Sequence, residues 1–233
     1  MFKNPGAPTA PIPDSDLAPA GLPFLGDDQS LDVEGVISIG ASWDASSRGR
    51  GGVFGKLSRK AGSDLDAVAV LFQDEEPVTL CAGFDGNLMN PLHHRPGDGA
   101  ITHSGDNRTG EGDGDDEVIS IHLATIPGEF HKIVVMVSAF KAGNKAMGDK
   151  GFQGANNVLF TIYDGTGASA DPAFCVRPSL VGTENCVIVA VLNRINDEAG
   201  RPTVRWKLEK RKVRVNVRHG DQMDLIRKAA AAN

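Results

Sequence analysis

The stretch "VISIHLATIPGEFHKIVVMVSAF" (118–140) decides the fold class, because it holds two apolar segments of strand length separated by a turn that contains proline and glycine. In the first segment, isoleucines alternate with Ser120 and His122, which predicts a strand with one buried side and one solvent-facing side. The second segment, 132–140, is apolar on both sides and predicts a central strand that is covered on both faces.

The same strand signal recurs along most of the chain. Further segments of strand length rich in Val and Ile are 35–43, 65–72, 157–164, 186–195, 203–210 and 212–219. Gly, Pro, Asn and Asp separate them, and helical periodicity first appears near the end, where Asp221 can cap a short helix. The pattern predicts an all-β protein, a two-sheet β-sandwich with short peripheral helices.

Composition bounds the domain organisation. The 233 residues are 40% hydrophobic and 23% charged with a net charge of −6, which disfavours global disorder and a generally cationic nucleic-acid binder. We expect a proline-rich flexible leader (1–32), one sandwich domain (33–219) and a short C-terminal helix or tail (220–233). No apolar run is long enough to cross a bilayer and no secretory signal is seen, so we expect a cytoplasmic protein.

Two other features are expected to be structural. The widely separated Cys81, Cys175 and Cys186 predict buried thiols, since their spacing fits neither a zinc site nor a disulfide framework. The basic segment 46–63 predicts a solvated loop. Its "GGVFGKL" is not a phosphate-binding loop, because Leu57 stands where a Ser or Thr must hold magnesium.

A glycine-rich segment, "GDNRTGEGDGDDE" (105–117), holds six carboxylates. Two unit charges about 4 Å apart repel by roughly 4 kcal/mol at the effective dielectric of a protein surface, so these groups must either splay apart or be neutralised by a cation. Carboxylate and carbonyl oxygens suit calcium better than zinc, copper or magnesium. The alternative is a solvated, flexible turn.

The acidic segment does not follow the EF-hand pattern, because counting Asp106 as position 1 places Glu111 at position 6, where a glycine is required. Other carboxylates lie beside predicted strands: Asp44 follows one, while Asp64 and Asp66 share one side of the next. We expect these three segments to converge around calcium at one end of the sandwich.

Four segments in this order resemble the TerD family of tellurium-resistance and stress-response proteins: "SWDA" (42–45), "SDLDA" (63–67), "HSGDNRTGEGDGDDEVISIHLATIP" (103–127) and "KIVVMVSAF" (132–140). The third segment is the most specific. The resemblance covers roughly residues 33–210, which corresponds to a single domain.

The resemblance implies a calcium-binding β-sandwich with a C2-like topology, no established enzymatic activity, and a role in resistance to tellurite and other chemical stress. It implies two calcium ions and a calcium-dependent scaffold or sensor that works with other stress-response proteins near the inner face of the membrane. The positions that match the family's metal-binding motif are Asp44, Asp64, Asp66, Asp106, Asn107, Asp115, Asp116 and Glu117, with the carbonyls of Gly110 and Gly112.

Departures from the family pattern concern partner choice rather than the metal. The segment 46–63 is longer than the usual link, and Arg108 replaces an apolar residue. One alternative function is a metal-dependent hydrolase that pairs carboxylates with one of its histidines, for which the candidates are His93, His94, His103 and His122.

A third function is an anionic-lipid or nucleic-acid binding module that uses a C-terminal basic ribbon, Arg201, Arg205, Lys207, Lys210, Arg211, Lys212, Arg214 and Arg218. The structural interpretation of the same residues is a solvated face. Arg205, Lys207 and Glu209 would then face solvent, while Val204, Trp206 and Leu208 would be buried.

Overall fold

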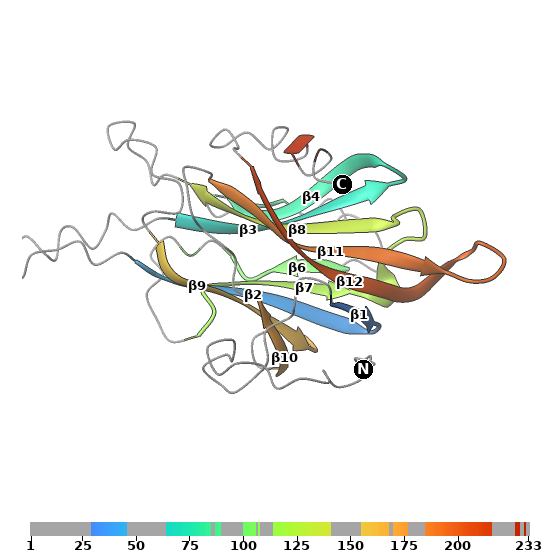
Figure 1. The fold of residues 1–233 in the computed structure, drawn as a ribbon, viewed down its shortest axis with the longest axis horizontal. Helices are drawn as coiled ribbons and strands as arrows, with labels where there is room; N and C mark the ends of the chain where they lie inside the picture. The colour runs from blue at the N-terminus through green and yellow to red at the C-terminus, as the bar shows by residue number, and fades with distance from the viewer. Residues whose placement is uncertain are drawn as a thin grey trace, which may run out of the picture.

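Two antiparallel sheets pack face to face as the two layers of a β-sandwich (Figure 1). The computed structural model describes residues 29–45, 64–84, 87–89, 100–105, 107, 114–140, 155–167, 170–176, 185–215, 227–228 and 231. The seven-stranded sheet has the order β1-β12-β11-β8-β3-β4-β5, and the five-stranded sheet has the order β10-β9-β2-β7-β6. The predicted all-β sandwich is confirmed.

The strands are β1 (Ser30–Val33), β2 (Val36–Ala45), β3 (Asp64–Gln73), β4 (Glu76–Phe84), β5 (Asn87–Met89), β6 (Ile101–His103), β7 (Glu117–His122), β8 (Lys132–Phe140), β9 (Ala155–Asp164), β10 (Asp171–Val176), β11 (Cys186–Asn196) and β12 (Pro202–Val215). A 3-10 turn, η4 (Leu123–Thr125), follows β7, and residues 227, 228 and 231 are helical within the expected tail. Within the described residues, no helix has the length and apolar character needed to cross a bilayer.

Apolar side chains fill the space between the sheets. Ile119 and Ile121 of β7 face inward, as the alternation of their strand predicts, and meet inward-facing residues such as Leu71 and Trp206 of the other sheet. A second apolar cluster, which includes Val70 of β3, lies on the opposite face of β3, β8 and β11. These central strands are therefore buried on both faces, as their continuous apolar runs predict.

Strands with weaker apolar patterns escaped the sequence prediction. These are β1, β4, β5, β6 and β10, most of which are short or contain proline. The strand β1 begins at Ser30, inside the range expected for the leader, and pairs with β12. The two strands expected at 203–210 and 212–219 form one strand as far as Val215, and residues 216–219 lie outside the described part of the chain.

The sequence predicts that the outer face of β7 is exposed to solvent, and this prediction is wrong at Ser120. Ser120 is buried. Its hydroxyl lies 2.7 Å from that of Ser38 on β2 and accepts a hydrogen bond from Gly167 N at 3.1 Å. Gly167 belongs to the turn between β9 and β10, so this turn lies against the outer face of the five-stranded sheet. The alternation of polar and apolar residues along β7 cannot show that a distant turn covers its outer face.

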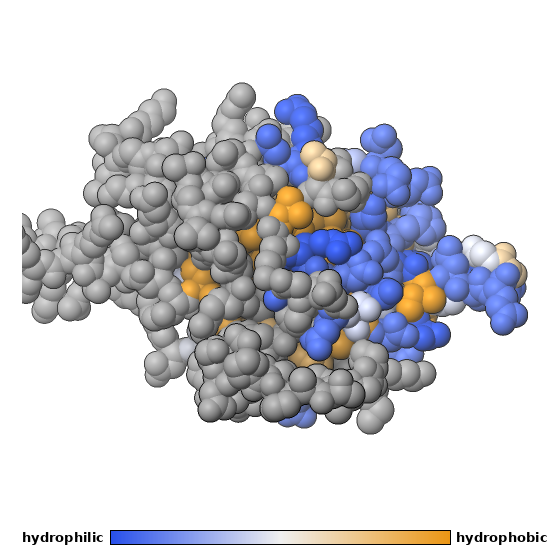
Figure 2. All heavy atoms as spheres, in the orientation of Figure 1, coloured by the Kyte–Doolittle hydropathy of each residue, from blue (hydrophilic) through white to orange (hydrophobic). Residues whose placement is uncertain are grey.

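The β11–β12 hairpin extends beyond the body of the sandwich (Figure 1), and the face around it is mostly hydrophilic (Figure 2). Val204, expected to be buried, is 50% exposed near the tip of this hairpin. Lys210, expected in the basic ribbon, is buried because it follows Trp206 and Leu208 on the inward-facing side of β12.

Candidate metal site

The predicted ligands fall into three groups in the structure. Asp66, Asn107, Asp115, Asp116 and Glu117 are described with their side chains. Asp44 lies near the end of β2 and Asp64 begins β3, but their side chains are outside the description. Asp106, Gly110 and Gly112 lie outside the described residues, as do the other members of the acidic segment from Arg108 to Asp113.

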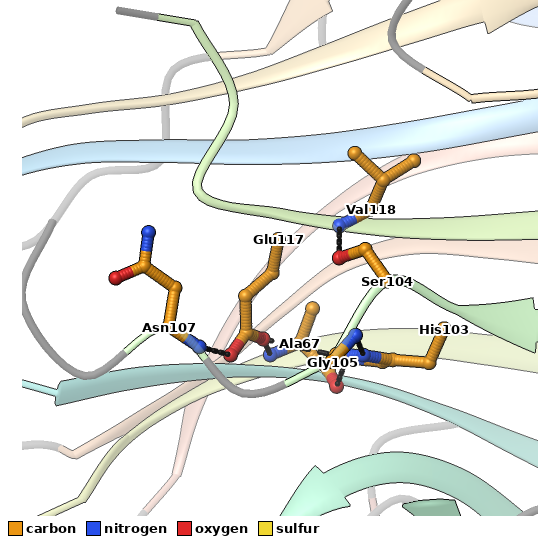
Figure 3. A network of polar contacts seen from close by, with 7 residues as sticks. All are labelled: Ala67, His103, Ser104, Gly105, Asn107, Glu117 and Val118. Carbon is orange, nitrogen blue, oxygen red and sulfur yellow. Dashed lines mark hydrogen bonds and ion pairs between the residues drawn. The ribbon is translucent and has the colours of Figure 1, made fainter. Parts of the chain in front are cut away.

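Glu117 is the first residue of β7 and points between the two sheets, where its side chain is fully buried. Its Oε2 accepts a hydrogen bond from Ala67 N of β3 at 2.7 Å, and its Oε1 accepts one from Asn107 N at 3.2 Å (Figure 3). Burial raises the pKa of the Glu117 carboxyl, while its bonds with His103, Ala67 and Asn107 act in the opposite direction. The carboxylate therefore bridges two sheets and the acidic segment.

His103 ends β6 beside Glu117 and is also buried (Figure 3). Its Nδ1 accepts a hydrogen bond from Gly105 N at 3.0 Å, which assigns the proton of the neutral ring to Nε2. That Nε2 lies 3.1 Å from Ala67 O and 3.4 Å from Glu117 Oε2. Both ring nitrogens are thus engaged by the protein itself.

Asp116, near the end of the acidic segment, contacts β2. Its Oδ2 accepts a hydrogen bond from Trp43 N at 2.9 Å, and its Oδ1 accepts one from Asn107 Nδ2 at 2.9 Å. The backbone continues the contact, because Asp116 N donates to Ala41 O at 2.8 Å. Asp116 therefore fixes the acidic segment to the end of β2, one residue from Asp44.

Asp115 lies on the outer face of the five-stranded sheet. Its Oδ2 accepts a hydrogen bond from the Tyr163 hydroxyl of β9, and a Cβ added at Gly40 of β2 would lie 1.9 Å from the same oxygen. Burial raises the pKa of the Asp115 carboxyl, the Tyr163 bond lowers it, and the charge of Asp116 raises it again. Only a glycine at position 40 leaves room for this carboxylate.

The three predicted acidic segments do meet at one end of the sandwich. Trp43 is next to Asp44, and its bond to Asp116 brings β2 to the acidic segment. Ala67 is next to the buried Asp66, and its bond to Glu117 does the same for β3. The segments converge, but the described carboxylates themselves point in different directions.

The chemistry of this region fits a hard cation. The predicted ligands are carboxylate, amide and carbonyl groups, whose oxygens calcium prefers, and the imidazole of His103 is bonded to the protein. Among the residues that the structure describes, no group of three or more His, Cys, Asp or Glu side chains gathers closely enough to hold a metal ion. A complete site therefore needs oxygens from the other predicted ligands, and the assignment of individual ligands stays a prediction.

Comparison with known proteins identifies the chain by its sequence. The model of the TerD domain matches residues 27–208. The chain belongs to the TerD family. One TerD-family relative is tellurium resistance protein TerX of Serratia marcescens, which is 31% identical over 64% of this chain and 76% of TerX.

Other TerD relatives are matched over a smaller part of their length. Stress response protein SCP2 of Bacillus subtilis is 34% identical over 45% of this chain and 50% of SCP2, so the chain spans about half of that relative. The crystal structure of a homologue of telluride resistance protein TerD from Streptomyces coelicolor has a TM-score of 0.57. It is 19% identical and covers 86% of this chain and 100% of that chain, which supports the TerD fold.

Several residues of this TerD site were not singled out as site residues in the sequence. Ala67 and Trp43 contribute backbone N–H groups, which no side-chain pattern reveals. Gly40 could have been recognised in the sequence, because a glycine in the middle of an apolar strand often marks a position where another group approaches the backbone closely. His103 opens the most specific TerD segment, but as a histidine beside carboxylates it indicates only the catalytic alternative, and no sequence pattern distinguishes Tyr163.

The alternative functions gain little from this structure. His103 has no nitrogen available for a substrate, His122 is half-buried, and His93 and His94 lie outside the described residues. Cations of the basic ribbon form ion pairs with carboxylates: Arg201 with Asp197, Arg205 with Asp32, and Lys207 and Arg211 with Glu209. These pairs offset positive charge that anion binding would need.

Proposed function

We propose that this TerD-family protein is a non-catalytic calcium-binding protein of the tellurite and chemical stress response. Calcium would bind where the acidic segment 105–117 meets the ends of β2 and β3. The observation that supports this most strongly is the pair of hydrogen bonds from Trp43 N to Asp116 and from Ala67 N to Glu117. Each bond places a strand that carries predicted ligands against the acidic segment.

The proposed ligand oxygens come from Asp44, Asp64, Asp66, Asp106, Asn107, Asp115 and Asp116, and from the carbonyls of Gly110 and Gly112. Each carboxylate offers about four lone-pair positions, so a carboxylate such as Asp115 can accept a hydrogen bond and still contribute lone pairs to a cation. Calcium takes six to eight oxygens, which two ions can share among bridging carboxylates. Glu117 has a different role, which is argued in the next subsection.

A bound cation would offset the unfavourable negative charge of this region. Burial and the charge of Asp116 both raise the pKa of Asp115, which means that its negative charge is unfavourable in this setting. Bound calcium would offset that cost. Free calcium at 100 times its dissociation constant would stabilise the bound fold by about 2.7 kcal/mol.

The stress-response role rests on the relatives, which are named for tellurium resistance and stress response. We propose that calcium orders the acidic segment and thereby shapes a surface for another protein of a stress-response complex. The protein would act as a calcium-dependent scaffold or sensor rather than as an enzyme. In support, His103 is buried with both nitrogens bonded, which leaves it unsuited to general base catalysis.

Calorimetric titration and thermal melting test the calcium proposal. We expect calcium to bind the metal-free protein and raise its Tm, and chelation with EGTA to reverse both effects. Asp64→Asn and Asp106→Asn should weaken binding, because each removes a charged ligand oxygen. Glu75→Gln is the matched control, since Glu75 is an exposed carboxylate that pairs with Lys132. Titration without heat, together with a Tm indifferent to calcium and EGTA, would refute the proposal.

A further inference from the structure

We propose that His103 and Glu117 form a positioning pair that takes the place of a neighbouring strand at Ala67 and locks the acidic segment against β3. The inference rests on the proposed calcium site, because it assigns these residues to building that site rather than to binding the ion. Neither residue touches the metal in this assignment. Their function is to hold two ligand-bearing segments in a fixed relation.

The lock begins at the main chain of Ala67. The pairing of β3 with β4 runs from Gln73 to Val68, so Ala67 lies one residue beyond its end. There Ala67 N donates to Glu117 Oε2 at 2.7 Å, and Ala67 O lies 3.1 Å from His103 Nε2. In a β-ladder, the adjacent strand would supply an acceptor for this N–H group and a donor for this carbonyl. Here two side chains from the other sheet supply them.

The other ends of the same side chains hold the acidic segment. His103 Nδ1 accepts from Gly105 N at 3.0 Å, and Glu117 Oε1 accepts from Asn107 N at 3.2 Å. Two backbone amides of the segment are therefore fixed by the groups that bind Ala67 (Figure 3). Gly105 has a φ of 111°, a conformation that favours glycine and that turns the chain toward the ring.

The arrangement explains why Glu117 is fully buried, whereas the two aspartates before it are only half-buried. Glu117 is fully buried, and three protein N–H groups lie against its two oxygens, at Ala67, Asn107 and His103. A buried carboxylate is tolerated when hydrogen bonds to protein donors replace its hydration. The pair therefore connects β3, which begins with Asp64, to the first turn of the acidic segment through protein groups alone.

Two isosteric changes at position 103 separate the two halves of the lock. His103→Gln keeps an N–H donor where Nε2 is, and so preserves the contact with Ala67 O, but it removes the acceptor for Gly105 N. His103→Asn keeps an acceptor near Nδ1 and removes the donor to Ala67. His122→Gln is the control, because His122 is a half-buried histidine at the far end of β7.

Amide hydrogen exchange and nitrogen NMR of the full-length, metal-free protein test the lock directly. We expect a neutral His103 ring protonated at Nε2, and slow exchange at Gly105 and Asn107. His103→Gln should speed exchange at Gly105 by about tenfold, as expected for the loss of one hydrogen bond, and His122→Gln should not. A ring protonated at Nδ1, or equally fast exchange at Gly105 in wild type and variant, would overturn the inference.

Calcium titration then distinguishes positioning from simple structural support. A positioning role predicts that His103→Gln raises the calcium Kd by about tenfold in a protein that remains folded, whereas His122→Gln leaves the Kd unchanged. An unchanged Kd in a folded His103→Gln protein would overturn the positioning role. If wild type itself binds no calcium, the proposed function fails, while the exchange and NMR results still decide whether the lock exists.

Discussion

Asp115 and Glu117 are separated by one residue, yet their carboxylates lie on opposite faces of the five-stranded sheet. Asp115 lies over Gly40 on the outer face, whereas Glu117 reaches between the sheets to Ala67 N. Residues two apart share a face only within a strand, and Asp115 precedes the start of β7. Gly114, with a φ of 101°, turns the chain just before it. This divergence separates charges that would otherwise repel each other.

Gly40→Ala should destabilise the protein by roughly 1–3 kcal/mol, the usual cost of overpacking. The added Cβ would lie 1.9 Å from Asp115 Oδ2, so the Asp115 side chain must move and lose its bond to Tyr163. Urea unfolding of both proteins measures the difference. Gly40→Ala combined with Asp115→Ala should recover part of the loss, because the clashing carboxylate is gone. A Gly40→Ala protein as stable as wild type would contradict the close approach.

Tyr163→Phe should lower the free energy of unfolding by roughly 1 kcal/mol, since it removes one hydrogen bond to a half-buried carboxylate. The effect should depend on its partner. In a double-mutant cycle, Tyr163→Phe should cost less in an Asp115→Ala background than in wild type. Equal costs in both backgrounds, measured by urea unfolding, would show that the two residues do not interact.

Cys81 should make stability fall with pH in the alkaline range. Burial raises the pKa of its thiol from 9.0 to about 12 in the folded state. Between these values the folded protein retains a proton that the unfolded chain releases, so the free energy of unfolding decreases as the pH rises. The slope from one such proton is at most about 1.4 kcal/mol per pH unit.

The measurement compares urea unfolding of wild type and Cys81→Ala from pH 8 to pH 11, a range chosen to begin below the thiol's ordinary value of 9.0. The variant should lose less stability with rising pH, in addition to a constant offset from the smaller side chain. Parallel curves for the two proteins would contradict a raised thiol pKa.

Arg194→Lys should destabilise the fold by roughly 2–3 kcal/mol, although the charge is kept. The Arg194 guanidinium lies 4.2 Å from the centroid of the Trp206 ring, and it donates to the carbonyls of Phe130, Ile126, Pro127 and Thr203. A lysine ammonium cannot reproduce this planar set of bonds. Urea unfolding measures the loss.

Arg211→Lys is the matched control for that change, because Arg211 is exposed and pairs with Glu209 on the same strand. Exposed ion pairs contribute about 0–1 kcal/mol, so this variant should unfold nearly as wild type does. Equal losses in Arg194→Lys and Arg211→Lys would show that the carbonyl contacts of Arg194 add nothing to stability.

The long central strands could be predicted because their signal is local. Apolar residues recur at the strand period over β3, β8 and β11, and their burial on both faces follows from unbroken apolar runs. The short strands could not, because β5 and β6 have three residues each and exist only through their neighbours. The solvent exposure predicted for Ser120 is wrong for a similar reason, since the turn that covers it is distant in the sequence.

The positions of Asp44, Asp64 and Asp66 beside strands predict that the acidic segments converge. The bonds of Trp43 and Ala67 bring the backbones of these segments together, while the convergence of their carboxylates around an ion stays a prediction. The directions of the individual carboxylates could not be predicted. They depend on which backbone N–H groups lie within reach, and those groups belong to other strands. The roles of Gly40, His103 and Tyr163 emerged only from these contacts.

By itself, the amino-acid sequence determined that this chain forms a β-sandwich of the TerD family and that negative charge gathers in one glycine-rich segment. Apolar periodicity and local charge are properties of neighbouring residues, so they can be read along the chain. Only the tertiary structure decided that the carboxylates of Asp115, Asp116 and Glu117 point in different directions and bind different partners. The donors that receive them are brought close by strand pairing and sheet packing, which are contacts between residues far apart in the sequence.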